Sequence, residues 1–227
     1  MQVLTPLSSE TSRDYSLRVL RHNIITTEMR PGQMYSEKEL AASLGLSRTP
    51  MREALIDLAK MKIVEVYPQR GTAVAFIDYD TIAEACFMRE ALEVAVVRLC
   101  CEIEIPQRQL ATLDLNVRQQ NVFNDRAHVH ELMRLDNSFH AALFRIAGKS
   151  LSYSLMSATT VHFDRVRFLA VESVSDFKYI DDHALMVDAI RAHDADTACR
   201  LMHEHLHRYE EDAIALRAFY PQYFKRT

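Results

Sequence analysis

Apolar residues recur with the period of an α-helix on both sides of Gly45, within residues 35–59. A first helix would begin after Ser36, a favourable N-cap with a glutamate three residues later, and would end at Gly45. A second helix would be capped by Thr49, with Pro50 at its first position. The pattern predicts two short helices joined by a tight turn. Their buried faces would be Leu40, Ala41 and Leu44 in the first, and Met51, Leu55 and Leu58 in the second.

Alternating β-branched residues follow this helix pair directly. Residues 63–67 and 72–76 alternate in polarity, and the turn 68–71 (Pro-Gln-Arg-Gly) separates them. This pattern predicts a β-hairpin. Two short helices followed by a hairpin are typical of a winged helix-turn-helix, whose second helix enters the DNA major groove with its N-terminal residues toward the bases. The two helices alone also fit an ordinary helical hairpin in an all-α core, and the hairpin after them favours DNA binding.

From residue 81 onward the hydrophobic period is helical throughout. Helices are predicted over 81–104, 106–124, 127–147, 151–170, 182–193 and 195–219, with 171–182 as a loop or short helix. A further helix is expected at 14–27. We therefore predict a mainly α protein in which an N-terminal winged helix-turn-helix, residues 1–77, precedes a C-terminal antiparallel all-helical bundle, residues 78–227. The short polar stretch between them would limit the movement of one domain relative to the other.

Composition and charge add to this division. The net charge of −4 argues against non-specific nucleic-acid binding, but residues 1–76 carry a net +2 and residues 77–227 a net −6. A mildly basic N-terminal part followed by an acidic C-terminal part fits a small DNA-binding domain attached to a domain with another role. The sequence shows no signal peptide and no membrane span, so we expect a soluble cytoplasmic protein without a membrane partner. Free buried thiols are expected at Cys86, Cys100, Cys101 and Cys199.

Four potential metal ligands are spaced so that they would meet inside the bundle. Asp136 and His140 lie four apart on one predicted helix and point the same way, while His183 and His205 lie on two later helices. Three imidazoles and one carboxylate in a bundle core suit Zn²⁺, Ni²⁺, Fe²⁺ or Mn²⁺, and ligand type does not choose among them. The alternative is that these histidines are surface residues. Helical phase predicts exposure for His128, His130, His193, His203 and His207, and the i, i+2 spacing of H-x-H-x-H at 203–207 does not place those side chains on one face.

The segment SEKELAASLGLSRTPMREALIDLAKMKIVEVYPQRGTAVA resembles the DNA-binding domain of GntR-type bacterial transcription regulators, through its S-R-T-P-x-R-E-A-L run and Q-R-G turn. The resemblance covers roughly the first third of the chain. An arginine beside a glycine at a hairpin tip suits minor-groove or phosphate contact, because glycine lets the backbone approach closely. The resemblance implies that operator DNA is contacted by Lys38, Arg48, Thr49, Arg52, Arg70 and Gly71.

The segments LDNSFHAALFRIAG, DHALMVDAIRAHD and MHEHL resemble the effector domain of the FadR subfamily of these regulators, the FCD type, over most of residues 80–215. In many members the matching residues bind a divalent metal. The resemblance therefore implies a metal site, with zinc the most expected ion, at Asp136, His140, His183 and His205. Arg89 lies in a segment similar to the family's R-x-x-L-E, where a guanidinium near the metal would clamp a carboxylate.

Further effector-binding candidates are Arg165 and Arg167 on the fourth predicted helix of the bundle. The alternative for these two residues is solvated surface charge. The alternative for Arg89 is an ion pair with Glu93 on its own helix.

The features above predict a ligand-responsive transcription regulator and not an enzyme. A homodimer would bind double-stranded, pseudo-palindromic operator DNA as a repressor, and a small organic acid bound at the metal and the arginines would release it. One alternative is a metal-dependent hydrolase, which would need a general base beside the metal, and no motif supplies one. Another is a metal-free regulator that binds an acyl-CoA or other apolar ligand, against which the presence of all four ligand residues argues.

Overall fold

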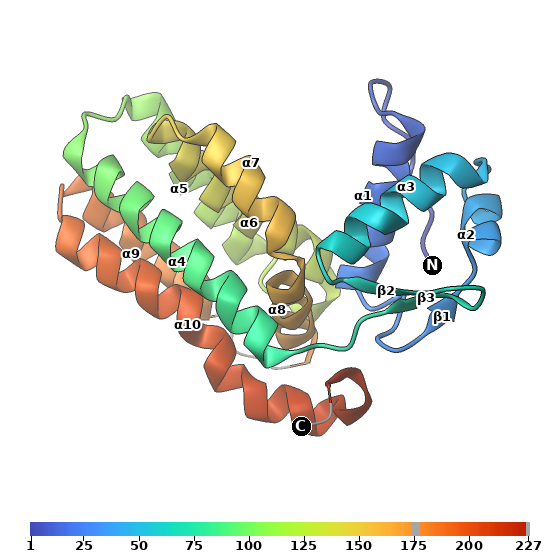
Figure 1. Ribbon diagram of the computed structural model, residues 1–227. Coiled ribbons are helices and arrows are strands. Elements are labelled where there is room, and N and C mark those ends of the chain that lie inside the picture. The colour runs from blue at the N-terminus through green and yellow to red at the C-terminus, as the bar shows by residue number, and fades with distance from the viewer. Residues whose placement is uncertain (174–177, 226–227) are drawn as a thin grey trace.

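The computed structural model describes residues 1–173 and 178–225. Three helices and a small sheet form an N-terminal lobe, and the remaining helices form an antiparallel bundle beside it (Figure 1). The predicted fold class is confirmed. No helix among the described residues has the length and apolar character needed to cross a bilayer.

The N-terminal lobe contains the predicted helix pair and hairpin. Its sheet is antiparallel with strand order β1-β3-β2, and Met34 pairs with Ala73 at the edge. Strand β1 was not predicted, because two residues are too short to show a period. The elements are α1 (Ser12–Ile25), β1 (Met34–Tyr35), α2 (Glu37–Ser43), α3 (Arg48–Lys60), β2 (Val64–Tyr67) and β3 (Gly71–Val74).

The helix ends confirm one predicted cap and correct another. The Oγ of Ser36 accepts a hydrogen bond from the backbone N–H of Glu39 at 3.1 Å, as a capping box requires. The prediction that Thr49 caps α3 is wrong, because Ser47 is extended and α3 already begins at Arg48. Pro50 then lies later in the first turn, where the backbone N–H that it lacks would in any case have no intrahelical partner.

The core of this lobe lies between α1, α2, α3 and the sheet. The predicted inward faces of α2 and α3 are buried, except that Leu44 is half-buried. Val161 from the bundle is fully buried in the same core. The N-terminal lobe therefore packs against the bundle through shared apolar contacts as well as through the chain that connects them.

The bundle consists of α4 (Tyr79–Glu102), α5 (Gln107–Val122), α6 (Val129–Ile146), α7 (Ser150–Thr159), α8 (Val161–Ser173), α9 (Lys178–Arg191) and α10 (Ala195–Phe219), with short 3₁₀ turns at Arg126–His128 and Pro221–Tyr223. The single helix predicted over 151–170 is wrong, because the chain bends at Thr160 between α7 and α8. The hydroxyls of Thr159 and Thr160 donate to carbonyl oxygens three residues earlier, at 2.7 and 3.3 Å, and such bonds compete with the helical ladder.

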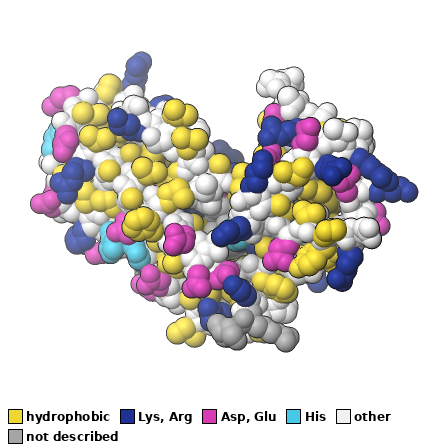
Figure 2. Space-filling view, in the orientation of Figure 1, with side chains coloured by type: hydrophobic (Ala, Val, Ile, Leu, Met, Phe, Trp, Pro, Cys, Tyr) yellow, Lys and Arg dark blue, Asp and Glu magenta, His cyan; other side chains and the backbone are white. Residues whose placement is uncertain are grey.

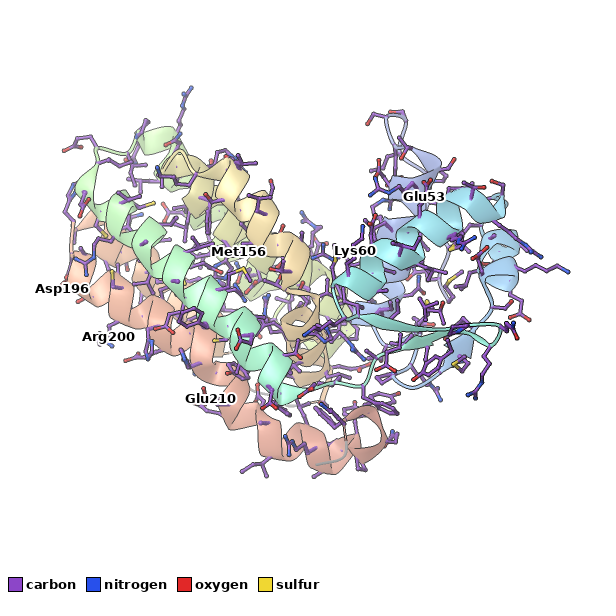
Figure 3. The ribbon with its side chains drawn as sticks, in the orientation of Figure 1. Glu53, Lys60, Met156, Asp196, Arg200 and Glu210 are labelled. Atoms are coloured by element: carbon purple, nitrogen blue, oxygen red, sulfur yellow. The ribbon has the colours of Figure 1, made fainter. Side chains whose placement is uncertain are left out.

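Two boundaries in the second half of the bundle also differ from the prediction. Helix α8 continues to Ser173, and α9 begins at Lys178, four residues earlier than expected. The predicted loop or short helix therefore falls partly in these helices and partly on residues 174–177, which lie outside the described residues. Met156 of α7 points into the bundle (Figure 3) and is buried.

The connection between the two lobes is held by the C-terminal end of the chain, which lies beside it (Figure 1). The backbone N–H of Ile77 donates to the carbonyl of Tyr223, and the N–H of Lys225 donates to the carbonyl of Ile77, both at 2.9 Å. Lys225 Nζ also lies 2.8 Å from Asp78 Oδ2. Since Ile77 is buried in the bundle core as well, the linker has fixed contacts on both sides.

Candidate metal and effector site and DNA-binding surface

The four predicted metal ligands meet inside the bundle. Asp136 and His140 come from α6, His183 from α9 and His205 from α10, and each is at least nine-tenths buried. One donor atom from each lies within 4.8 Å of the others. The Nε2 atoms of His140 and His183 each lie 3.8 Å from an oxygen of Asp136, the first from Oδ2 and the second from Oδ1.

Partners on other helices orient the three imidazoles. His140 Nδ1 contacts Glu93 of α4. His183 Nδ1 lies 2.9 Å from Gln120 Oε1 of α5, and His205 Nδ1 lies 3.4 Å from Asp182 Oδ2 of α9. Such a contact on one ring nitrogen fixes the ring and leaves the other nitrogen for a metal. Gln120 is itself held by Asn116, its Nε2 lying 2.6 Å from the Oδ1 of that residue.

The donor atoms at the centre of this cluster are not satisfied by the protein. Among the described residues, Asp136 Oδ1, His140 Nε2 and His183 Nε2 are buried and have no hydrogen-bond partner. A buried polar atom without a partner is costly, and a cation at their common focus would remove that cost. Three imidazoles and one carboxylate are a donor set that first-row divalent ions accept, so the residues present fit a metal ion.

The protonation states also suit metal binding. Burial and the neighbouring His205 hold the pKa of His183 well below its usual value, and burial lowers the pKa of His205 despite its contact with Asp182. Burial opposes ionisation of Asp136, but Arg167 and the surrounding histidines outweigh it and hold the pKa of that carboxyl well below its usual range. At neutral pH the imidazoles of His183 and His205 therefore keep their lone pairs and the carboxylate of Asp136 keeps its charge, as ligands must.

Two of the three predicted effector arginines lie beside the cluster. Arg167 contacts Asp136 Oδ2 and also lies 3.5 Å from Asp164. Arg89 donates to Glu93 at 2.6 Å, so the predicted alternative pairing on its own helix is present, and it also lies over the Phe163 ring. Both arginines line one pocket, together with Asp136, His205, Arg208, Phe163, Val166, Tyr179 and Tyr209.

The third arginine is placed differently. Arg165 is fully buried, does not line this pocket, and its guanidinium nitrogens have no hydrogen-bond partner among the described residues. Burial lowers its pKa to about 9. Arg165 lies four residues after Val161 and so shares its side of α8, the side that enters the N-terminal core. The structure therefore brings Arg89 and Arg167 together with the metal cluster but not Arg165.

Several residues of the site were not found from the sequence. Glu93, Gln120 and Asp182 orient the histidines, and Arg208 forms a two-point contact with Asp182 at 2.6 and 2.7 Å while it lines the pocket. Asp182 directly precedes the ligand His183, and this adjacency is only a weak indication that Asp182 belongs to the site. Glu204 also precedes a ligand histidine, but it is exposed and accepts from Arg200 on the outer side of α10 (Figure 3). Adjacency in sequence therefore does not bring Glu204 to the metal cluster.

Charged contacts run from this site to the N-terminal lobe. Arg21 of α1 donates to the carbonyl of Ser157 and lies 3.8 Å from Asp164 of α8. Since Asp164 pairs with Arg167, and Arg167 with Asp136, alternating charges connect α1 to the metal cluster. Helix α1 in turn packs against α3.

The predicted DNA-binding side chains lie on the outer surface of the N-terminal lobe. Those that carry a side chain are all exposed: Lys38 on α2, Arg48, Thr49 and Arg52 on α3, and Arg70 at the hairpin tip. Figure 2 shows basic side chains along this outer edge.

Gly71 has an evident structural role. It has φ +120°, and a Cβ there would lie 2.5 Å from the carbonyl oxygen of Tyr35. Glycine is thus required where β3 passes β1, whatever the residue contributes to a DNA contact.

Comparisons with known proteins agree with both halves of the structure. Residues 18–74 match the model of the bacterial regulatory proteins of the gntR family, and residues 84–208 match the FCD domain. The chain is 35% identical over 213 residues to an uncharacterized HTH-type transcriptional regulator in an unstable DNA locus of Streptomyces ambofaciens, covering 93% of this chain and 89% of that protein. It is 31% identical over 201 residues to the HTH-type transcriptional repressor RspR of Escherichia coli, covering 88% of each.

Solved structures share the fold. Escherichia coli McbR/YncC superposes with a TM-score of 0.77 at 20% identity, over 93% of this chain and 99% of that one. A putative transcriptional regulator GntR from Rhodococcus sp. RHA1 superposes with a TM-score of 0.69 at 23% identity, over 89% and 97%.

Proposed function

The chain belongs to the GntR family of DNA-binding transcription regulators and carries an FCD effector domain, and from this premise we propose that it is a metal-dependent repressor of the FadR subfamily that a small organic acid releases from operator DNA. It is a regulator and not an enzyme. Because bacterial DNA lies in the cytoplasm, that compartment would be its place of action. Residues 1–77 would be the DNA-binding domain and residues 78–227 the domain that senses the effector.

The DNA contacts follow from the exposed basic residues of the N-terminal lobe. Arg48 and Arg52 lie one turn apart on the N-terminal half of α3, where side chains of a recognition helix read base edges or bind phosphates. Thr49 lies beside them, and Lys38 would bind the DNA backbone. Arg70 at the hairpin tip, followed by Gly71, would contact the groove edge.

The metal would be held by Asp136, His140, His183 and His205. The buried, unsatisfied donor atoms of Asp136, His140 and His183 are the single observation that carries this part of the proposal. A divalent ion held there, zinc being the first candidate, supplies positive charge at the inner wall of the pocket. Glu93, Gln120 and Asp182 keep the imidazole rings in position for it.

The effector pocket combines cationic and apolar groups. Arg89 and Arg167 present guanidinium groups that form paired hydrogen bonds with a carboxylate. Phe163 and Val166 supply apolar walls. This combination suits a small organic acid with a short apolar part. Arg165, which lies outside the pocket lining, is not assigned an effector contact.

Release from DNA would follow from the charged contacts of Arg167. When a carboxylate binds this guanidinium, it competes with Asp136 and Asp164 for the same donors. A change at Asp164 alters its attraction to Arg21, and α1 carries that change toward α3. An effector that favours one arrangement of these contacts shifts the population of DNA-binding molecules.

Exposed apolar side chains on the bundle support a homodimer. Phe87 of α4 is 71% exposed, and Leu151 and Leu155 of the adjacent α7 are 73% and 65% exposed. Figure 2 shows hydrophobic side chains over this part of the bundle. Exposed apolar groups of this size mark association surfaces, and a two-fold dimer would present two winged helices to a pseudo-palindromic site.

A thermal-shift screen tests the sensing half of the proposal. Purified protein stripped by a chelator is heated with a panel of organic acids, with and without zinc chloride. We expect an acid to raise the melting temperature of the wild-type protein only when zinc is present. In Asp136→Asn, neither zinc nor the acid should raise the melting temperature. The exposed control Asp188→Asn should behave as wild type. Stabilisation by acyl-CoA or an organic acid in the absence of any metal would contradict the proposal.

A further inference from the structure

A second group of metal-ligand side chains lies on the outside of the bundle, away from the buried cluster. It consists of Glu90 on α4 and His203 and His207 on α10. The two histidines are four residues apart, so they share one face of the helix, and their ring centroids are 4.3 Å apart. The expectation that H-x-H-x-H does not form a common face holds for His205 relative to either neighbouring histidine. It does not hold for the first and last histidines of the motif, which are four residues apart. Figure 2 shows histidine and acidic side chains together over α4 and α10.

The three side chains converge. Glu90 Oε1 lies 2.7 Å from His203 Nδ1, and Glu90 Oε2 lies 3.7 Å from His207 Nε2. Two ligands of one zinc ion, each at 2.0–2.2 Å, are no more than about 4.4 Å apart. Both separations fall within that limit, and the shorter one, a hydrogen bond here, would widen when an ion takes the place of the shared proton. The side chains are 34%, 51% and 30% exposed respectively, so an ion can reach them from solvent.

A hydrogen bond on the far side of His207 orients its ring. His207 Nδ1 lies 2.9 Å from the carbonyl oxygen of His203, which only accepts, so Nδ1 carries a proton. Its Nε2 atom is thereby directed toward the carboxylate of Glu90, on the same side as His203.

We propose that Glu90, His203 and His207 form a surface site for one first-row divalent ion that prefers imidazole, such as Zn²⁺, Ni²⁺ or Cu²⁺. The expectation that no motif supplies a general base is wrong for the sequence, because α10 here fits H-E-x-x-H, in which the glutamate serves as a general base. Glu204 instead accepts from Arg200 at 3.1 Å on the exposed face, so we assign this glutamate no role as a base and propose metal binding alone. The ion would tie α4, which begins at the linker, to α10, which carries His205 of the buried cluster.

The test counts zinc ions. Chelator-treated full-length protein is dialysed against zinc chloride at neutral pH, and bound metal is measured by mass spectrometry. We expect His203→Gln/His207→Gln to bind one zinc ion fewer per chain than wild type, with unchanged circular dichroism. The control His128→Gln/His193→Gln, which removes two exposed histidines elsewhere, should bind as much zinc as wild type.

The two sites are told apart by a buried-site variant. His140→Gln should retain the outer ion, and this result is independent of whether the proposed effector sensing is correct. Untagged wild-type protein should also elute from a Ni²⁺-charged resin at higher imidazole than the His203→Gln/His207→Gln variant. Two results would overturn the proposal. One is equal zinc content in wild type and His203→Gln/His207→Gln, and the other is no bound zinc in folded His140→Gln.

Discussion

Arg167 of α8 contacts the carboxylate of Asp136 on α6, so one side chain serves both the metal cluster and the effector pocket. The carboxylate would be a ligand of the metal, and it is also the counter-ion of Arg167 when no other anion is bound. An organic acid would provide such an anion. This shared carboxylate is the physical reason to expect that metal, arginine and effector act together.

Replacing Arg167 by methionine should lower the affinity for the effector without preventing metal binding. A hydrogen bond to a charged group contributes about 1.5–3 kcal/mol, which corresponds to roughly 10-fold to 150-fold in affinity. Isothermal titration of zinc-loaded protein with the acid found by the screen measures this loss. The exposed Arg145→Met, on the same helix as Asp136 but away from the pocket lining, should bind the acid normally. Unchanged affinity in Arg167→Met would remove this residue from the effector site.

Removing Arg21 should uncouple the two lobes. Arg21 contacts Ser157 and lies near Asp164, so Arg21→Met takes away the charged contact between α1 and α8. We expect operator affinity to stay near that of wild type, while the fold-change caused by the acid, typically about 5-fold to 150-fold for coupled sites, falls toward one. Fluorescence anisotropy with and without the acid measures both values.

Arg13→Met is the matched control for this experiment. Arg13 pairs with Asp57 inside the N-terminal lobe and leaves the contact with α8 intact. It should therefore keep the full response to the acid. If Arg21→Met responded to the acid as strongly as Arg13→Met, the coupling would run through other contacts.

Gly71→Ala should destabilise the winged domain. Its φ is +120°, and the new Cβ would lie 2.5 Å from the carbonyl oxygen of Tyr35, so backbone strain and a backbone clash add. We expect a loss of about 2–4 kcal/mol in the free energy of unfolding of this lobe. Gly148→Ala also has a positive φ but meets no atom within 4 Å, so it should cost only about 1 kcal/mol. Urea unfolding followed by circular dichroism compares the two, and equal losses would contradict the role assigned to the contact with β1.

His162 should make stability depend on pH. This residue of α8 is 4% exposed, and burial, with the nearby Arg165, lowers its pKa to about 4. Its pKa in the unfolded chain is near 6.5, so between these values the unfolded chain binds more protons and stability falls as pH falls. The loss is on the order of 3 kcal/mol by pH 4.

Thermal unfolding from pH 7 to pH 4 in the presence of a chelator measures this dependence. His162→Gln should make it less steep and leave the part that the buried His183 and His205 contribute, whereas the exposed His193→Gln should leave it as in wild type. Curves of equal steepness for wild type and His162→Gln would show that this imidazole does not remain neutral in the fold.

Sequence periodicity was sufficient for the helices and for part of the site. Spacing placed Asp136 and His140 on one face and proposed His183 and His205 on later helices as their partners, and the family resemblance implied the same four residues. The partners of these ligands depend on which helices pack together, so Glu93 and Gln120 carried no clear signal. The bend at Thr160 was missed because a hydrophobic period does not register hydroxyl bonds to the backbone.

The contacts around the linker show the same limit. Ile77 pairs with residues near the C-terminal end of the chain, a relation between distant segments that a local pattern does not contain. The two-residue strand β1 is recognisable only by its pairing with β3.

The operator dissociation constant of zinc-loaded and of chelator-treated protein, each with and without the effector acid, tests the central claim most directly. The operator can be obtained by selection from random duplexes. We predict that the acid weakens operator binding at least about 10-fold in the zinc-loaded protein and has no effect in the metal-free protein. An equal effect of the acid on both forms would contradict the account.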